Sequence, residues 1–130
     1  MATTSTDPRV RCVQGSATVA QVNAGIVIVP DVPGRVVTVV DGWLRAIGGA
    51  AGTATGVYIQ DTAATAGSTL EWLIGALTQN AVARIGAANV TSTYAGVQMT
   101  RDKGIQMKTH GAALDTATSV DYCIYFTVSI

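Results

Sequence analysis

The side chains that could do chemistry are few and widely separated in this chain of 130 residues. The single histidine, His110, lies beside a predicted turn, and a catalytic base needs a positioned partner that its neighbours do not supply. Together with Cys12 and Cys123 it offers scattered metal ligands, without the short spacings that zinc sites use. We expect His110 to be a solvated loop residue, and we predict no metal site.

The acidic residues and the glycine-rich stretch also argue against catalysis. All of the eight carboxylates except Glu71 and Asp121 fall in predicted turns or at strand ends, where aspartate commonly hydrogen-bonds its own backbone. The stretch 48–52 is rich in glycine but lacks the Gly-Lys-Ser/Thr ending of a phosphate-binding loop. We therefore predict that the protein is not an enzyme and has no catalytic residues, no cofactor and no small-molecule substrate.

The two cysteines are predicted to be free thiols. Cys123 belongs to the more polar parity of the last predicted strand. In the first predicted strand, Cys12 falls on the same side as Val10 and on the opposite side from Arg9 and Arg11. If the first and last strands are neighbours, the two thiols should point to opposite faces of the sheet, too divergent for a disulfide.

These residues must be positioned by strands, and the clearest strand is the C-terminal stretch 119–130. Even-numbered positions from Val120 to Ile130 are apolar or aromatic, whereas odd-numbered positions from Asp121 to Ser129 are more polar. Unbroken alternation of β-branched and aromatic residues predicts a half-buried strand. We expect this strand to lie beside the N-terminal strand, so that both chain ends join one sheet.

The remaining strands are shorter runs between turns rich in small residues. The candidates are 9–13, 25–30, 35–47, 55–61, 68–78, 81–85, 96–99 and 104–107. For 68–78 the spacing of the leucines also fits a helix, but strands on both sides favour a strand. Gly42 is expected to mark a bulge rather than a hairpin turn. The near-copies 96–99 and 104–107 predict a hairpin that is closed by a left-handed Gly104.

About eight strands without a secure helix predict an all-β, single-domain β-sandwich of the jelly-roll type. The domain is expected to span 9–130, after a short flexible N-terminal arm at 1–8 that is small and polar. Trp43, Trp72 and Tyr58 are interpreted as core aromatic residues in preference to a sugar-stacking platform.

Composition narrows the functional classes. Hydrophobic residues make up 48% of the chain and charged residues only 12%, with a formal net charge of zero. Average domains carry about 25% charged residues, so a neutral, charge-poor chain predicts association with other copies. Neutrality also argues against nucleic-acid binding, and neither a secretory signal nor an apolar run long enough to span a bilayer is recognisable. We expect a protein made in the cytoplasm without a membrane partner.

Several phrases resemble the capsid cement, or decoration, proteins of tailed bacteriophages. They are V-V-D-G-W-L-R-A-I-G-G-A-A at 39–51, L-T-Q-N-A-V at 77–82, G-A-A-N-V-T at 86–91 and A-T-S-V-D-Y at 117–122. The resemblance implies a homotrimer of jelly-roll subunits on the outer capsid surface of a virion, bound to the major capsid protein. By analogy, the N-terminal segment would grip the capsid through Thr3, Thr4, Asp7, Arg9 and Arg11.

The polar parity of the last strand is the candidate subunit interface. A solvent face would carry more charge than this set does, namely Asp121, Cys123, Tyr125 and Thr127. The alternative function is a carbohydrate- or receptor-binding jelly-roll module of a phage particle, which requires an exposed Trp43 or Trp72.

Overall fold

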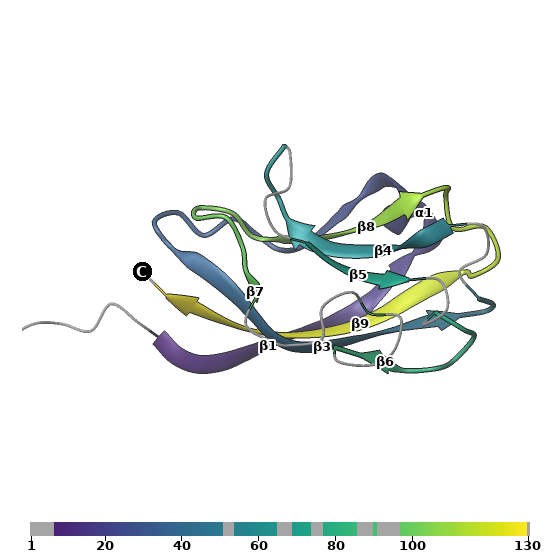
Figure 1. The fold of residues 1–130 in the computed structure, drawn as a ribbon, viewed down its shortest axis with the longest axis horizontal. Coiled ribbons are helices and arrows are strands. Elements are labelled where there is room, and N and C mark those ends of the chain that lie inside the picture. Colours follow the sequence, from purple (N-terminus) through teal and green to yellow (C-terminus); the bar gives the residue numbers. More distant parts are fainter. Residues whose placement is uncertain are drawn as a thin grey trace, which may run out of the picture.

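The computed structural model describes residues 7–50, 54–64, 69–73, 77–85, 90 and 97–129. They form two antiparallel sheets that pack face to face, as Figure 1 shows. Sheet A contains, in spatial order, β1 (Asp7–Thr18), β9 (Ser119–Ser129), β3 (Val36–Ile47) and β6 (Ala83–Arg84), and β7 (Val97–Gln98) also pairs with β3. Sheet B contains, in spatial order, β2 (Ile26–Val29), β8 (Ile105–Gly111), β4 (Ala54–Asp61) and β5 (Thr69–Leu73).

The strand order is that of a jelly roll. Apart from β7, and from β4 and β5 which are consecutive neighbours in sheet B, the chain passes back and forth between the sheets, and the first strand lies beside the last in sheet A. The second strand correspondingly lies beside β8 in sheet B. The predicted all-β sandwich is therefore confirmed, with nine strands in the described part of the chain.

Strand alternation builds the core between the sheets. In β9 the inward parity includes the buried Val120, Ile124 and Phe126. In β3 the inward residues are Val37 and Val39 at first and then Leu44 and Ala46, all with no more than 1% exposure. In a regular strand every second residue points inward, but the inward positions change from odd numbers (Val37 and Val39) to even numbers (Leu44 and Ala46). One extra residue must therefore lie between these two groups. This change of parity sets which side chains of β3 face outward.

The extra residue is a β-bulge at Val40. The register between β3 and β9 shifts between Val39 and Asp41, and the strand then continues without a turn. A bulge was predicted at Gly42, two positions further on, and the hairpin alternative does not occur. Gly42 instead lies where β9 comes closest, since a Cβ there would be 2.8 Å from Cδ1 of Ile124.

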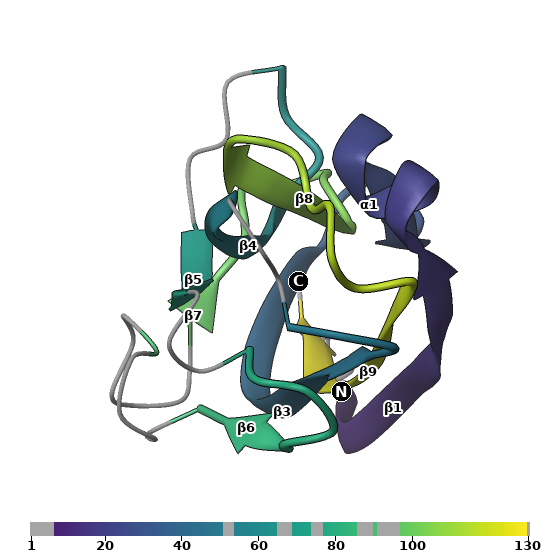
Figure 2. The same ribbon diagram turned by 90° about the vertical axis from the view of Figure 1, so that its right-hand side faces the viewer.

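One short helix, α1 (Val19–Ala24), was not predicted from the sequence. It begins with a capping box, in which the Thr18 hydroxyl accepts from the Gln21 amide and the Gln21 side chain accepts from the Thr18 amide. Val22 faces inward and is fully buried. Figure 2 shows the helix beside β8 and next to β1, where it covers one side of the sandwich.

The predicted hairpin of 96–99 and 104–107 is wrong. β7 pairs with β3 in sheet A, whereas β8 pairs with β2 and β4 in sheet B, so the two similar segments belong to opposite layers. The left-handed residue of the connecting turn is Asp102, with φ 72°, and Gly104 has another role that is described below.

Two other sequence predictions have clear outcomes. Residues 69–73 form strand β5, as favoured over a helix, and Trp72 is fully buried in the core. β1 begins at Asp7, two residues before the predicted start of the first strand at Arg9. Residues 1–6 lie outside the described part of the chain. In the ranges that are described, no helix is long and apolar enough to cross a membrane.

Candidate binding surface on the outer face of sheet A

The outer face of sheet A is the surface of this sheet that points away from sheet B, at the bottom of the molecule in Figure 1. The register of β1, β9 and β3 places side chains of matching parity side by side on it. Its residues include Cys12, Gln14 and Ser16 of β1, Asp121, Cys123, Tyr125 and Thr127 of β9, and Asp41, Trp43 and Arg45 of β3. The four predicted interface residues therefore share one surface.

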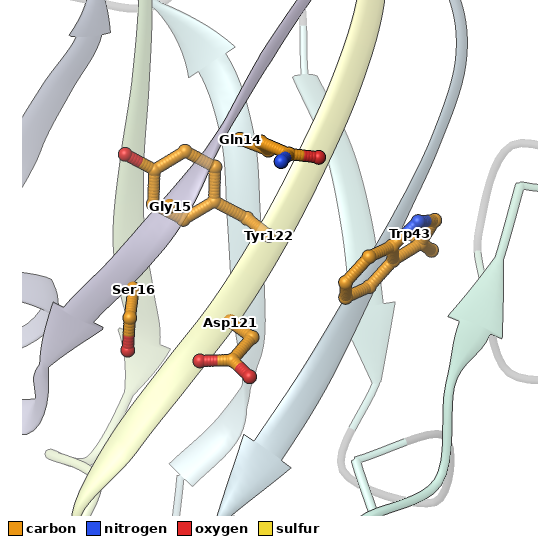
Figure 3. Close-up of a pocket in the computed structure, with 6 residues that line it drawn as sticks. All are labelled: Gln14, Gly15, Ser16, Trp43, Asp121 and Tyr122. Carbon is orange, nitrogen blue, oxygen red and sulfur yellow. The ribbon is translucent and has the colours of Figure 1, made fainter.

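An open hollow of about 410 Å³ lies on this face across the three strands. Figure 3 shows the residues that line it, which are Gln14, Gly15, Ser16, Trp43, Asp121 and Tyr122. Gly15 stands opposite Tyr122, and a Cβ on this glycine would lie only 2.9 Å from the tyrosine hydroxyl. The Tyr122 ring thus takes the space that a side chain at position 15 would need. Tyr122 itself belongs to the inward parity of β9 and packs against the core. The hollow therefore combines the Trp43 indole with the amide, hydroxyl and carboxylate groups of Gln14, Ser16 and Asp121.

The charges on this surface are paired with one another. Nη2 of Arg45 donates to Oδ2 of Asp121 at 2.8 Å, and the guanidinium lies 6.0 Å from the centre of the Trp43 ring. Nη2 of Arg84, from the neighbouring β6, lies 3.1 Å from Oδ2 of Asp41. Hydrogen bonds from Arg45 and Ser16 hold the pKa of Asp121 below its ordinary value. The outer face of sheet A is therefore polar but close to neutral.

The pairing of Asp121 predicts a small acid sensitivity. Because the folded pKa is lowered, the stabilisation is complete above the unfolded pKa of about 3.8 and is lost as the pH falls through the folded value. Arg45 is 38% exposed, so the pair contributes about 1 kcal/mol or less. Urea titrations of the wild type, Asp121→Asn, Arg45→Met and the double variant between about pH 3 and 7 measure this coupling. Equal acid dependence of all four proteins would contradict the assignment.

The two cysteines lie on the same face, contrary to the sequence prediction. Sγ of Cys12 is 3.2 Å from Sγ of Cys123. Cys12 of β1 stands opposite Tyr125 of β9. Residues that stand opposite each other in a sheet point to the same face, and Tyr125 points outward, so Cys12 points outward as well. Thiols on opposite faces would require Cys12 to point inward together with Val10, but Val10 is 59% exposed. Both cysteines remain unbonded thiols in this structure, Cys12 exposed and Cys123 buried.

A second group of polar side chains, which the sequence did not predict, occupies the outer face of sheet B. Nδ1 of His110 in β8 contacts Oε2 of Glu71 in β5, and the imidazole stacks on Tyr58 of β4 with ring centres 4.6 Å apart. His110 is thus a half-buried strand residue rather than a solvated loop residue. Gly56 of β4 stands between the partners and leaves room for their contact. Because Glu71 is only 9% exposed, it needs such a partner, and we assign the pair a structural role.

The predicted capsid-contact residues are only partly described. Thr3 and Thr4 lie outside the described residues, and Asp7 is the first residue of β1. Arg9 and Arg11 follow in the same strand and are exposed. β1 is the outermost strand of sheet A on its side, so these arginines lie at an edge of the sandwich.

Within the described ranges, no three or more His, Cys, Asp or Glu side chains gather in a way that could hold a metal ion. In the comparisons with known proteins, no family model, curated protein or solved structure matched this chain.

Proposed function

We propose that this chain is a structural protein of a bacteriophage particle, a capsid cement subunit that binds the outer capsid surface as a homotrimer. The observation that supports this proposal most directly is the outer face of sheet A. It is broad and close to neutral, and its ion pairs Arg45–Asp121 and Arg84–Asp41 satisfy its charges internally. The resemblance of the sequence phrases to decoration proteins gives the proposal its biological setting.

The composition of this face suits contact with another copy. The outward parity of β9 holds one charged residue, Asp121, beside Cys123, Tyr125 and Thr127. Interface centres are depleted in charge and enriched in tyrosine and tryptophan, and Tyr125 and Trp43 are both half-buried here. Aromatic side chains of this kind contribute much of the binding energy when a partner excludes water from them.

The N-terminal edge is the proposed contact with the major capsid protein. Exposed Arg9 and Arg11 lie near the start of the edge strand β1, which begins at Asp7 and follows the segment 1–6. An edge strand offers backbone hydrogen-bonding groups to a partner. Three such edges in one trimer would bind together, so that weak individual contacts add up to retention on the shell. Binding of this kind stabilises the shell by linking neighbouring capsomers.

Placing a charge on the outer face of sheet A should dissociate the trimer without unfolding the subunit. Thr127→Arg introduces an unpaired guanidinium into the proposed interface, at an expected cost of about 2–3 kcal/mol, or roughly a hundredfold in the association constant. Sedimentation velocity measures the effect. The matched control is Val27→Arg, since Val27 is 55% exposed and belongs to sheet B. Equal masses for the two variants would exclude this face as the subunit contact.

Binding to capsids tests the role in the particle. Purified protein should bind in a saturable manner to undecorated shells of the virus that encodes it, and the decorated shells should withstand more heat. Arg9→Ala with Arg11→Ala should weaken this binding while leaving the trimer intact. A protein that is monomeric and ignores the shells would contradict the proposal.

A second candidate function is carbohydrate binding, and the hollow on the outer face of sheet A supports it. Trp43 presents a half-buried indole beside Gln14, Ser16 and Asp121, a combination of stacking and hydrogen-bonding groups that suits a sugar ring. Trp72 cannot serve in this role because it is fully buried. A glycan array distinguishes the two functions: binding that Trp43→Ala abolishes favours the sugar site, and the absence of binding favours the cement role.

A further inference from the structure

The outer face of sheet A brings together two thiols from opposite ends of the chain. Sγ of Cys12 in β1 lies 3.2 Å from Sγ of Cys123 in β9, although 111 residues separate them in sequence. Cys12 stands opposite Tyr125 and Cys123 opposite Gln14, so the cysteines are diagonal neighbours on one face. We propose that this pair is an oxidisable site, where an intramolecular disulfide joins the first strand of the sandwich to the last.

The geometry requires only a short movement. A disulfide holds its sulfurs about 2.05 Å apart and needs side chains that converge, so these two sulfurs must approach by about 1.1 Å. Their present contact shows that the side chains converge. Rotation about the side-chain bonds, together with a small shift of the outermost strand β1, supplies a movement of this size.

The difference in exposure sets the order of the reaction. Cys12 is exposed whereas Cys123 is only 2% exposed, so Cys12 meets an oxidant first. The Cys12 thiolate attacks a small disulfide such as glutathione disulfide and releases one small thiol, leaving a mixed disulfide. The Cys123 thiolate then attacks Sγ of Cys12 and displaces the second small thiol. Two protein thiols are oxidised, one small disulfide is reduced, and the two protons end on the released thiols.

The surroundings of the pair favour the thiol form at neutral pH. The hydrogen bond with Cys123, followed by burial, raises the pKa of the Cys12 thiol above its ordinary value. Since a reducing cytoplasm keeps thiols reduced, the pair is expected to stay reduced there and to oxidise in an oxidising medium. The bond would close nearly the whole chain into one loop and thereby restrict the unfolded state. This inference rests on the contact of the two thiols and not on the proposed function, and it applies to subunits in which no other copy covers the outer face of sheet A.

The experiment compares the wild type with Cys12→Ser and Cys123→Ser. Each protein is incubated with glutathione disulfide at about pH 8.5, where a larger fraction of the thiols is ionised than at neutral pH, then treated with iodoacetamide in urea, which makes the buried Cys123 accessible, and weighed intact. The wild type should lose two hydrogen atoms, gain no alkyl group, and melt roughly 10 °C higher than in dithiothreitol. Cys12→Ser should keep one alkylatable thiol, Cys123→Ser should end as a glutathione adduct, and neither should gain thermal stability.

Other results would overturn the inference. They are two alkylated thiols in the oxidised wild type, a stable glutathione adduct on Cys12, or disulfide-linked dimers on a non-reducing gel. Because Cys12 is exposed, Cys12→Ser should melt at the wild-type temperature under reducing conditions. That variant therefore remains informative even if Cys123→Ser fails to fold.

Discussion

Replacing Trp72 by alanine is expected to lower the free energy of unfolding by about 3–5 kcal/mol. Trp72 is the largest fully buried side chain of the described core. Its Nε1–H also donates to the carbonyl oxygen of Ala83 at 2.8 Å. Since Trp72 belongs to β5 of sheet B and Ala83 to β6 of sheet A, this bond crosses the sandwich. The substitution removes both a large apolar volume and a polar link between the layers.

Two control variants separate these contributions. Trp72→Phe keeps most of the apolar volume but loses the N–H donor, so about 1–2 kcal/mol of destabilisation is expected. Trp43→Ala removes an indole from the outer face of sheet A and should cost less than Trp72→Ala, because Trp43 is only half-buried. Chemical denaturation monitored by circular dichroism gives all three values. A loss below about 1 kcal/mol for Trp72→Ala would show that the core is packed differently.

Substituting Gly104 by alanine is expected to be similarly harmful, at about 3 kcal/mol, although it adds a single methyl group. A Cβ at this position would lie 1.9 Å from the carbonyl oxygen of Val29 and 2.5 Å from that of Pro30, so the backbone itself must move. The amide of Gly104 also donates to Oδ1 of Asp31 at 3.0 Å. Hydrogen bonds from Thr62 and Gly104 lower the pKa of Asp31. Displacing Gly104 would disrupt this group where β8 begins.

Gly34→Ala is the matched control for Gly104→Ala. Gly34 has φ +73°, but no atom lies within 4 Å of the place that a Cβ would take, so alanine there meets backbone strain without a clash. Its expected cost is about 1 kcal/mol. Thermal melts of the two variants therefore isolate the steric contribution. If Gly34→Ala proved the more damaging of the two, the close approach of Gly104 to β2 would be contradicted.

The fold could be predicted where the information is local. Alternation in 119–129 identified β9 and its buried parity, because a strand with one face in the core repeats every two residues. The helix at 19–24 could also have been found, since Thr18 and Gln21 have the spacing of a capping box. The hairpin prediction failed because the similarity of 96–99 and 104–107 says nothing about the sheet to which each segment belongs.

The candidate sites depend on register between distant strands, which the sequence does not encode locally. Arg45 and Asp121 are complementary charges on strands that were both recognised, but only the pairing of β3 with β9 places them opposite each other. The contact of His110 with Glu71 passes over the intervening β4. The cysteine prediction identified the neighbouring strands but assigned β1 the wrong outward parity, and this single error placed the thiols on opposite faces.

The mass of the protein in solution tests the central claim most directly, namely that the neutral outer face of sheet A makes this chain a trimeric structural subunit. Multi-angle light scattering should give three times the 13.3 kDa of one chain, and the value should not change over a hundredfold range of concentration. Thr127→Arg should give a mass that falls towards that of one chain on dilution, while Val27→Arg remains trimeric. A wild-type protein with the mass of a single chain at every concentration would contradict the account.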